Sequence, residues 1–434
     1  MRYLLLAAMA VAGCLASGPQ AAGESDRPLS ITLDSAIKRA REYSQQYLAA
    51  GTAAALARED RVQARAALLP TLNALNQYIG TQSNGTSSGV FIANDGPHVY
   101  NEQAVVHADL FSVTKTAEYR KARAAEAAAL ARKDIASRGL VSTVVQDYYA
   151  LVSAKRRSGN AARNVDEAQR FLDITQKQEA GGEVARADVI KAQLQLKQRQ
   201  REQLDAETNV DKARLTLAVL MFPEIDQPFE VVDDLDADVA APALEDIRSR
   251  VFIRNPEIKA AEAGVSEAAA GEKAAKGAFV PSVAIDYFYG INANVFAIRG
   301  PEDRKNLGSA VQATVTIPVW DWGALRSKVH QAALQKRQAE TDLSYTRRQL
   351  RATADSSALE AQTARAQLAS LRSSLDLATQ SVRLTVLRYE AGEATALEVV
   401  DAQTTLAEAR NAYDDGLARY RVALANLQNL MGGF

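Results

Sequence analysis

Few side chains in this sequence are spaced so that they could perform catalytic chemistry. The three histidines, His98, His107 and His330, are scattered, and none has the spacing of metal ligands. The stretch "GEKAAKG" places lysines near glycines, but no segment has the G-x-x-x-x-G-K pattern that binds a nucleotide phosphate. We therefore predict that the protein is not an enzyme and holds no metal or cofactor, and that any energy it needs comes from a partner.

The single cysteine, Cys14, is the residue whose surroundings indicate a covalent modification. It ends "VAGC", which follows a basic Arg2 and a short apolar run typical of a secretory signal. This stretch resembles the bacterial lipobox, in which the cysteine becomes the lipidated first residue of the mature chain. We therefore expect a signal peptide over residues 1–13, a lipid on Cys14 and a linker over residues 14–29. The alternative is an ordinary signal cleaved near Ala21 or Ala22.

Two similar stretches are candidates for a binding site. They read "EAGGEVARADVIKAQ" and "YEAGEATALEVVDAQ" and lie about 210 residues apart, close to half of the chain. Each contains glycine within a long proline-free tract and therefore predicts a tight turn between two helices. We expect both turns to contact a partner protein, and a helical turn without a partner is the alternative. The predicted contact residues are Gly181, Gly182, Glu183, Val184, Ala185, Asp188, Gly392, Glu393, Ala394, Thr395, Leu397 and Glu398.

The elements that position these turns follow from composition. The net charge of −1 excludes a typical nucleic-acid binder, because phosphate contacts need a basic surface. Tracts rich in alanine, leucine, glutamine, arginine and glutamate predict helices, two of them on the order of 100 Å long. The helices are predicted over about residues 30–69, 112–178, 185–220, 244–277, 322–388 and 396–430.

Four strands are predicted between these helices, over about residues 71–84, 99–110, 282–290 and 307–317. Alternation is clearest where Val311, Ala313 and Val315 alternate with polar residues. Strands of about 10 residues with one apolar face are long enough to cross a bilayer in a barrel. A soluble sheet with one solvated face is the alternative. Four strands cannot close a membrane barrel, because the smallest have about eight, and so a membrane barrel requires a dimer or a trimer.

The order of elements indicates a tandem duplication. A first repeat over residues 30–220 and a second over 244–434 each contain a helix, two strands, a very long helix and a returning helix. A proline- and acid-rich connector over residues 221–243 joins them. Because each turn belongs to one repeat, the duplication explains why the turn sequence occurs twice.

The chain resembles the outer membrane factor family, the TolC-like outer-membrane efflux proteins, over nearly all of its mature length. The matching stretches are "ITLDSAIKRARE", "ARAALLPTLN", "FVPSVAI", "TVTIPVWDWGALRSKV" and "LRYEAGEATALEVVDAQTTLAEARNAY". The resemblance implies an α+β membrane protein, a homotrimer whose 12-stranded β-barrel has four strands per chain and continues as an α-helical barrel in the periplasm. It also implies a Gram-negative outer membrane, a periplasmic adaptor and an inner-membrane pump driven by protons or ATP.

This resemblance predicts an exit duct that conducts substrates passively and is gated at the helix tips. The candidate gate residues are Asp376, Arg383, Arg388, Tyr389 and Glu390. Solvated or weakly paired arginines are the alternative reading, because exposed ion pairs contribute little. Many members of the family have aspartates near the narrow tip, whereas "SVRLTVLRYEAG" has none.

Aromatic residues near the strands are candidates for the membrane boundary. Tyr287, Tyr289, Trp320 and Trp322 are predicted to lie in an aromatic belt, with core packing as the alternative for the tryptophans. Two other functions remain open at this point. One is the exit channel of a type I protein secretion system, and the other is a lipid-anchored periplasmic coiled-coil scaffold without a pore.

Overall fold

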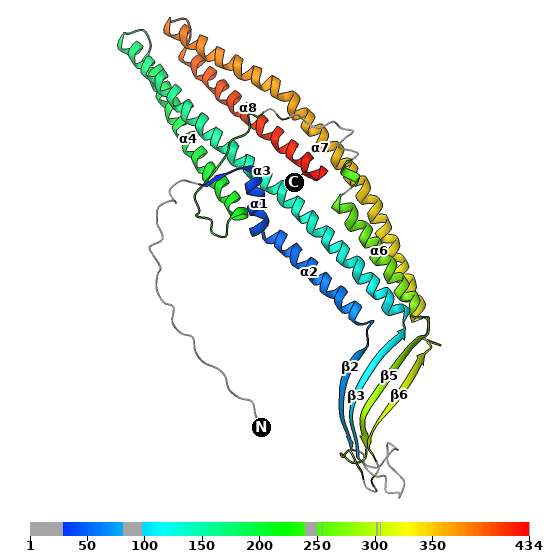
Figure 1. Cartoon of the computed structure of the whole chain (residues 1–434). Coiled ribbons are helices and arrows are strands. Elements are labelled where there is room, and N and C mark those ends of the chain that lie inside the picture. The colour runs from blue at the N-terminus through cyan, green and yellow to red at the C-terminus, as the bar shows by residue number, and fades with distance from the viewer. Residues whose placement is uncertain are drawn as a thin grey trace, which may run out of the picture.

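The computed structural model describes residues 29–80, 98–237, 239, 250–253, 255–300, 303 and 305–433. The predicted signal peptide, Cys14 and almost all of the predicted linker lie outside this part of the chain. So do residues 81–84 of the first predicted strand and residues 240–249 around the end of the connector. The described molecule is long and curved, with a sheet at one end and two helical hairpins at the other (Figure 1).

Two halves with the same order of elements make up the fold. The first half contains β1 (Leu29–Ile31), α1 (Leu33–Tyr43), α2 (Gln45–Ala66), β2 (Thr71–Gly80), β3 (His98–Phe111), α3 (Val113–Ala180) and α4 (Arg186–Met221). After β4 (Phe229–Val231), the second half contains α6 (Pro256–Gly277), β5 (Ser282–Ala293), β6 (Leu307–Thr316), α7 (Ala324–Glu390) and α8 (Ala396–Met431). Each half is a helical segment, two strands, a very long helix and a returning helix, which confirms the duplicated fold.

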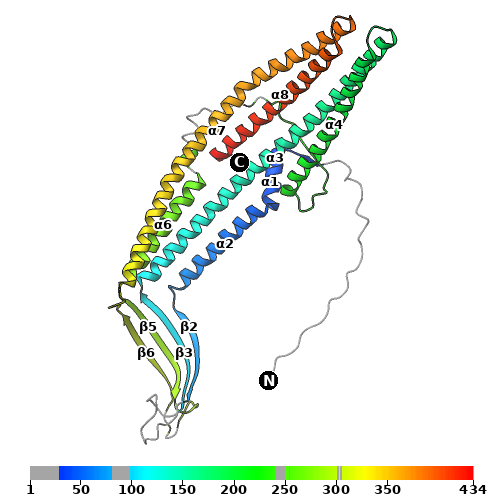
Figure 2. The same ribbon diagram turned by 180° about the vertical axis from the view of Figure 1, so that it is seen from behind.

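The two long helices run the length of the helical part. In both views α2 and α4 lie along successive stretches of α3, while α6 and α8 lie along successive stretches of α7 (Figures 1 and 2). Helix α3 also contacts α6 and α8, and so it joins the two halves. Where α7 packs closely, its buried residues are small: Ala358, Ala361 and Ala364 are at most 2% exposed. Small side chains let the helix axes approach.

The first helical stretch differs from its prediction. Instead of one helix over residues 30–69, the structure has β1, then α1, then a break at Ser44, whose ψ of 116° is extended, before α2. Thr32 begins α1 with a capping box in which Ser35 is the partner, as its spacing predicts. Ile31 in β1 is 1% exposed, and this burial holds the preceding segment in an extended conformation.

A small equatorial core surrounds β1. This strand pairs in parallel with β4 of the connector. The hydroxyl of Tyr148 in α3 donates to the carbonyl of Val232 at 2.7 Å and is 3.2 Å from the carbonyl of Ile31. Tyr148 is 1% exposed and lies in a cluster with residues of α1, α4 and α8. The connector is therefore packed onto the helices rather than being a free linker.

The four longer strands form one antiparallel sheet in the order β2-β3-β5-β6. Its register places Leu72, Val106, Tyr287 and Val311 in one row across the sheet. The neighbouring row, on the opposite face, is polar: Thr71, His107, Asp286 and Gln312. Successive side chains point to opposite faces, and so at these two rows one face of the sheet is apolar and the other is polar.

Both edges of this sheet lack a further strand among the described residues, because β2 and β6 each pair on one side. The apolar face is exposed at these edges, where Leu72 is 73% and Val311 is 70% accessible. In the described part of the chain, no helix is both long and apolar enough to cross a membrane.

Candidate docking tips and gate

The two helical hairpins end in turns of the same geometry. Gly182 and Gly392 both have φ of +76°, in the left-handed region that glycine adopts without a steric penalty. The amides of the following Glu183 and Glu393 donate back to carbonyls of the last helical turn at 2.9 and 2.8 Å. The tight turns predicted from the duplicated sequence are therefore present, one at the end of α3 and one at the end of α7.

At the α7–α8 tip, a hydrogen-bond network caps the N-terminus of α8. The Thr395 hydroxyl accepts from the amide of Glu398 at 3.3 Å, and the Glu398 carboxylate accepts from the amide of Thr395 at 3.1 Å. Hydrogen bonds from the Thr395 amide and hydroxyl, together with nearby Arg388, hold the pKa of Glu398 below its usual range. The acid thus has a structural role within its own tip.

The α3–α4 tip lacks this network. Ala185 occupies the N-cap position of α4 and offers no side-chain hydrogen bond. Arg186 instead pairs with Glu179 across the turn at 3.2 Å, and Asp188 lies half-buried in the first turn. The two tips therefore share a backbone but present different side chains.

We predict that Thr395→Ala loosens only the second tip. Loss of an N-cap hydroxyl costs about 1 kcal/mol, which speeds local amide exchange roughly fivefold. Hydrogen exchange measured by mass spectrometry will show this at the start of α8, and the start of α4 in the same molecule serves as the reference. Equal acceleration at both tips would contradict a local capping role.

The residues predicted to contact a partner are accessible at the tips. Leu397 is 48% exposed and leaves an apolar side chain at the surface of the tip. Exposed positions are Gly181, Gly182, Glu183, Ala185, Gly392, Glu393, Thr395, Leu397 and Glu398, and half-buried positions are Val184, Asp188 and Ala394.

Of the candidate gate residues, Tyr389 is the one that the structure brings to the opposite hairpin. Its side chain is 2% exposed, and its ring packs edge-on against Phe171 of α3 with centroids 5.2 Å apart. Its hydroxyl donates to the hydroxyl of Thr175 at 3.3 Å, and Gln178 donates to its carbonyl at 3.3 Å. Burial raises the pKa of Tyr389, and so the phenol remains a neutral donor.

The other gate candidates do not contact the opposite hairpin. Arg388 lies within its own tip, 3.6 Å from the Glu398 carboxylate, and donates to the carbonyl of Glu393. Within the described residues, the side chains of Asp376, Arg383 and Glu390 are exposed and form no hydrogen bond or ion pair.

Sequence reasoning missed the partners of Tyr389. Phe171, Thr175 and Gln178 recur at helical spacing on α3, but this pattern looks like any buried stripe. Phe171 belongs to an apolar tip cluster, which joins the two hairpins. Its buried members are Ala168, Phe171, Leu172, Val189, Ala192, Leu196, Tyr389, Ala396 and Val399.

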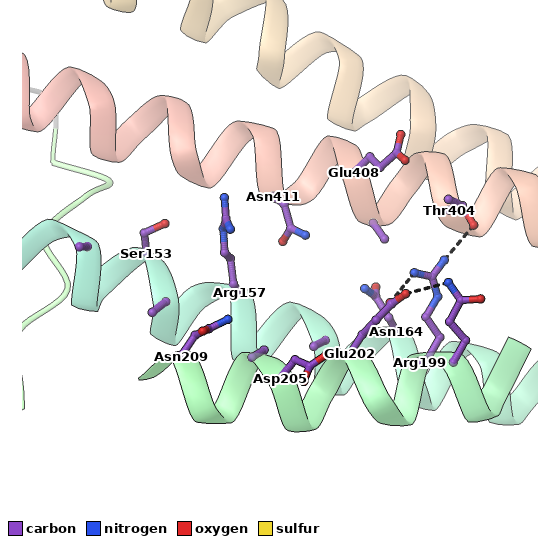
Figure 3. A pocket seen from close by; sticks show the side chains of 16 residues that line it. Ser153, Arg157, Asn164, Arg199, Glu202, Asp205, Asn209, Thr404, Glu408 and Asn411 are labelled. Atoms are coloured by element: carbon purple, nitrogen blue, oxygen red, sulfur yellow. Dashed lines mark hydrogen bonds and ion pairs between the residues drawn. The ribbon is translucent and has the colours of Figure 1, made fainter. Parts of the chain in front are cut away.

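A polar groove of about 690 Å³ separates this tip cluster from the equatorial core (Figure 3). It is lined by α3, α4 and α8. Arg199 is 6% exposed and donates to Glu202 at 2.7 Å and to Thr404 at 2.8 Å. Because this groove interrupts the apolar packing between the two clusters, the tip cluster is a packing unit distinct from the equatorial core.

The aromatic candidates lie at two levels of the sheet. Tyr287 and Tyr289 are 42% and 50% exposed and lie near the middle of β5, whereas Trp320 and Trp322 follow the end of β6. The tryptophans are 76% and 89% exposed and pack against each other with centroids 5.7 Å apart. Within the described chain they are not packed in a core.

Comparison with known proteins places this arrangement in a family. The family model described as "Outer membrane efflux protein" matches residues 36–221 and again residues 247–433, once in each half. The pyoverdine export outer membrane protein OpmQ of Pseudomonas aeruginosa is 27% identical over 93% of this chain and 85% of its own length. The cobalt-zinc-cadmium resistance protein CzcC of Cupriavidus metallidurans is 25% identical over 67% of this chain and 66% of its own length.

Solved structures share the fold. The Campylobacter jejuni CmeC outer membrane channel superposes with a TM-score of 0.81 at 16% identity, covering 92% of this chain and 85% of that one. The Vibrio cholerae outer membrane protein VceC gives 0.80 at 19% identity, covering 92% and 96%. Channels of this family are trimers. They are transport proteins and not enzymes. The chain therefore belongs to the outer membrane efflux protein family, whose channels lie in the outer membrane of Gram-negative bacteria and extend a large helical part into the periplasm.

Proposed function

We propose that this chain forms the exit duct of a tripartite efflux system, conducting substrates passively from a periplasmic adaptor and an inner-membrane pump to the exterior. The observation that carries this proposal is the four-stranded sheet with one apolar and one polar face, continued by long helices. Lipid covers the apolar face, and the polar face lines water. A pore wall needs these two faces, whereas a periplasmic scaffold that does not enter the membrane does not need an apolar face toward lipid.

A closed ring of three chains completes the wall. An open sheet edge is not tolerated in lipid, because its backbone groups have no partners there. The edge of β6 in one chain therefore pairs with the edge of β2 in the next chain. Such a head-to-tail contact gives a closed ring when the rotation between neighbouring chains is a whole fraction of a turn. Three copies of the four-stranded sheet give the twelve strands expected of a trimer.

The lateral edges of the helical part also expose groups that a neighbouring chain can cover. On α4, Leu194 and Leu204 are 66% and 63% exposed, and on α7, Leu359 and Leu377 are each 63% exposed. Contact with another chain would remove these leucine side chains from water. We assign these two edges to the contact between neighbouring subunits.

The gate in this proposal is the tip cluster around Tyr389. Opening the tunnel requires the two hairpins to separate or slide, which breaks the contacts of Tyr389 with Phe171 and Thr175. A partner that binds the tips more tightly in the open arrangement shifts the population toward it. Arg383 and Asp376, which are exposed in the single chain, face solvent or the neighbouring subunit in this scheme.

The adaptor docks on the tips. Three chains with two tips each present six similar turns, which suits a six-fold adaptor ring. The test is photo-crosslinking in intact cells from a reactive residue at Ala394, with mass spectrometry of the captured protein. A reactive residue at Ala369, exposed on α7 away from the tips, is the matched control.

Capture of a periplasmic adaptor from position 394 and not from 369 is the expected result. An adaptor of a proton-driven pump supports small-molecule efflux, whereas an adaptor of an ATP-driven transporter supports type I protein secretion. Capture of no periplasmic protein, with efficient labelling, would contradict the docking proposal.

The lipid anchor on Cys14 remains part of the proposal. Metabolic labelling with a palmitate analogue tests it, and Cys14→Ser is the control. Label in the wild-type chain and none in the variant is expected, while an unlabelled wild-type chain would mean that the signal is cleaved later.

A further inference from the structure

A pocket of about 500 Å³ lies where the sheet meets the helices, between the start of α3 and the end of α6. The two helices touch closely here: a Cβ added at Gly277 would lie 2.9 Å from the Val113 side chain. Both residues line the pocket. The lining residues are Leu110, Phe111, Ser112, Val113, Thr116, Ala117, Arg120, Lys273, Lys276, Gly277 and Val280.

The lining has an apolar half and a cationic half. Leu110, Phe111 and Val280 are 62%, 50% and 39% exposed and present apolar surface. The cationic half consists of Arg120, Lys273 and Lys276, and the pocket lining includes no carboxylate. Lys276 pairs with Glu272 outside the pocket, whereas the exposed Arg120 and Lys273 form no ion pair within the described residues. The pocket therefore has unbalanced positive charge beside apolar surface.

The pocket opens on the apolar side of the sheet. Phe111 pairs with Val283, which in turn pairs with Val315, and this row belongs to the apolar face. Asp109 lies in the opposite, polar face and pairs there with Lys115. The ligand therefore approaches from the lipid side and not from the channel.

A neighbouring subunit does not cover this pocket. Strands β3 and β5 are the central strands of the sheet, and α3 and α6 are the helices that continue from its middle. The edges available for ring closure are β2 and β6, which lie to either side. The pocket thus remains open at the surface of the assembled channel, at the level where the strands end.

We propose that this pocket binds an anionic phospholipid of the inner leaflet of the outer membrane. The acyl chains lie on Leu110, Phe111 and Val280, and the phosphate and its anionic headgroup lie against Arg120, Lys273 and Lys276. A soluble phosphate compound would use the cations but leave the apolar half exposed to water. A zwitterionic lipid would cover the apolar half, but its net charge of zero would leave Arg120 and Lys273 unbalanced.

Native mass spectrometry of the purified full-length channel tests this proposal. The protein in detergent is mixed with phosphatidylglycerol, with phosphatidylethanolamine or with glycerol 3-phosphate. The detergent is then removed in the mass spectrometer, and the ligand molecules that remain bound are counted. Each basic side chain near an anionic headgroup strengthens binding roughly fivefold, and so the triple variant R120Q/K273Q/K276Q is expected to bind phosphatidylglycerol on the order of a hundredfold more weakly.

The matched control is R123Q/R132Q/K259Q, which removes three exposed cations from the same two helices outside the pocket. It is expected to retain phosphatidylglycerol like the wild type. Val280→Ser, which alters only the apolar half, is expected to weaken the lipid and not glycerol 3-phosphate. Equal retention of the two lipids, or equal loss in both triple variants, would overturn the proposal. So would equally strong retention of glycerol 3-phosphate, which would make the pocket a simple anion site.

Discussion

Tyr389→Ala is expected to open the channel. The substitution removes a ring that is 2% exposed and packed on Phe171, together with the hydrogen bond to Thr175. Truncating a buried aromatic side chain costs about 3 kcal/mol. If the hairpins lose these contacts on opening, that loss corresponds to roughly a hundredfold shift toward the open state. Conductance of purified wild-type and variant channels in planar bilayers measures the effect.

The conservative variant Tyr389→Phe separates packing from hydrogen bonding. It keeps the ring against Phe171 and loses only the hydroxyl, a change worth about 1 kcal/mol, or roughly fivefold in the equilibrium. Its open probability is therefore expected between the wild type and Tyr389→Ala. Hydrogen exchange at residues 165–175 gives an independent readout of tip loosening. A loosened tip with wild-type conductance would show that the tip cluster does not gate the channel.

Arg156→Gln is expected to release the connector from the helices. The Arg156 guanidinium in α3 donates to Asp233 at 2.5 and 2.8 Å, to Asp236 at 2.7 Å and to Asp414 of α8 at 3.2 Å. The arginine side chain is 18% exposed and that of Asp414 is 13% exposed. Removing one partner of a buried ion pair costs several kcal/mol, and the exposure of Asp236 reduces this to about 2 kcal/mol here.

The neighbouring Arg157 offers a matched control. It pairs with the single carboxylate of Asp415, and both side chains are well exposed, at 52% and 40%. Arg157→Gln is therefore expected to cost at most about 0.5 kcal/mol. Hydrogen exchange in residues 229–235 and thermal unfolding distinguish the two variants. Equal effects of both substitutions would contradict the special role of Arg156.

Acid is expected to act on the same contact. Burial alone would raise the pKa of Asp233, but hydrogen bonds from Arg156 and the Leu235 amide outweigh it and hold this pKa below its usual range. A lowered folded-state pKa contributes stability above the unfolded pKa of about 4, and this stability is lost as the pH falls through the folded value. Exchange at the connector should therefore accelerate below about pH 4 in the wild type and change less with pH in Arg156→Gln.

Local patterns were enough to predict the larger elements. Proline-free tracts and glycine turns predicted α3, α4, α7 and α8 within a few residues, and period-2 alternation predicted the strands. The short strands β1 and β4 were not foreseen, because three residues are too few to show a period. Nothing in the local sequence distinguishes Ser44, where the first helix breaks, from a serine within a helix.

The candidate site was predictable in position and not in detail. Similar turn sequences located both tips, but the hydrogen-bond partners of Tyr389 lie 211 and 214 residues away along the chain, and no local pattern reports such a contact. Glu398 was predicted to contact a partner, and the structure adds its reciprocal hydrogen bonds with Thr395 at the start of α8. Likewise, the acid-rich composition of the connector did not show that Asp233 and Asp236 meet Arg156 of α3 and Asp414 of α8.

Closure of the ring is tested most directly by disulfide trapping between edge strands. A cysteine at Asn73 of β2 is combined in turn with one at Ala310, Gln312 or Thr314 of β6, all on the polar face. Each single variant, and the wild type with Cys14 alone, serves as background. One pairing is expected to give a covalent trimer after oxidation in cells. Covalent dimers as the largest product, or no link from any pair, would contradict a channel built from three chains.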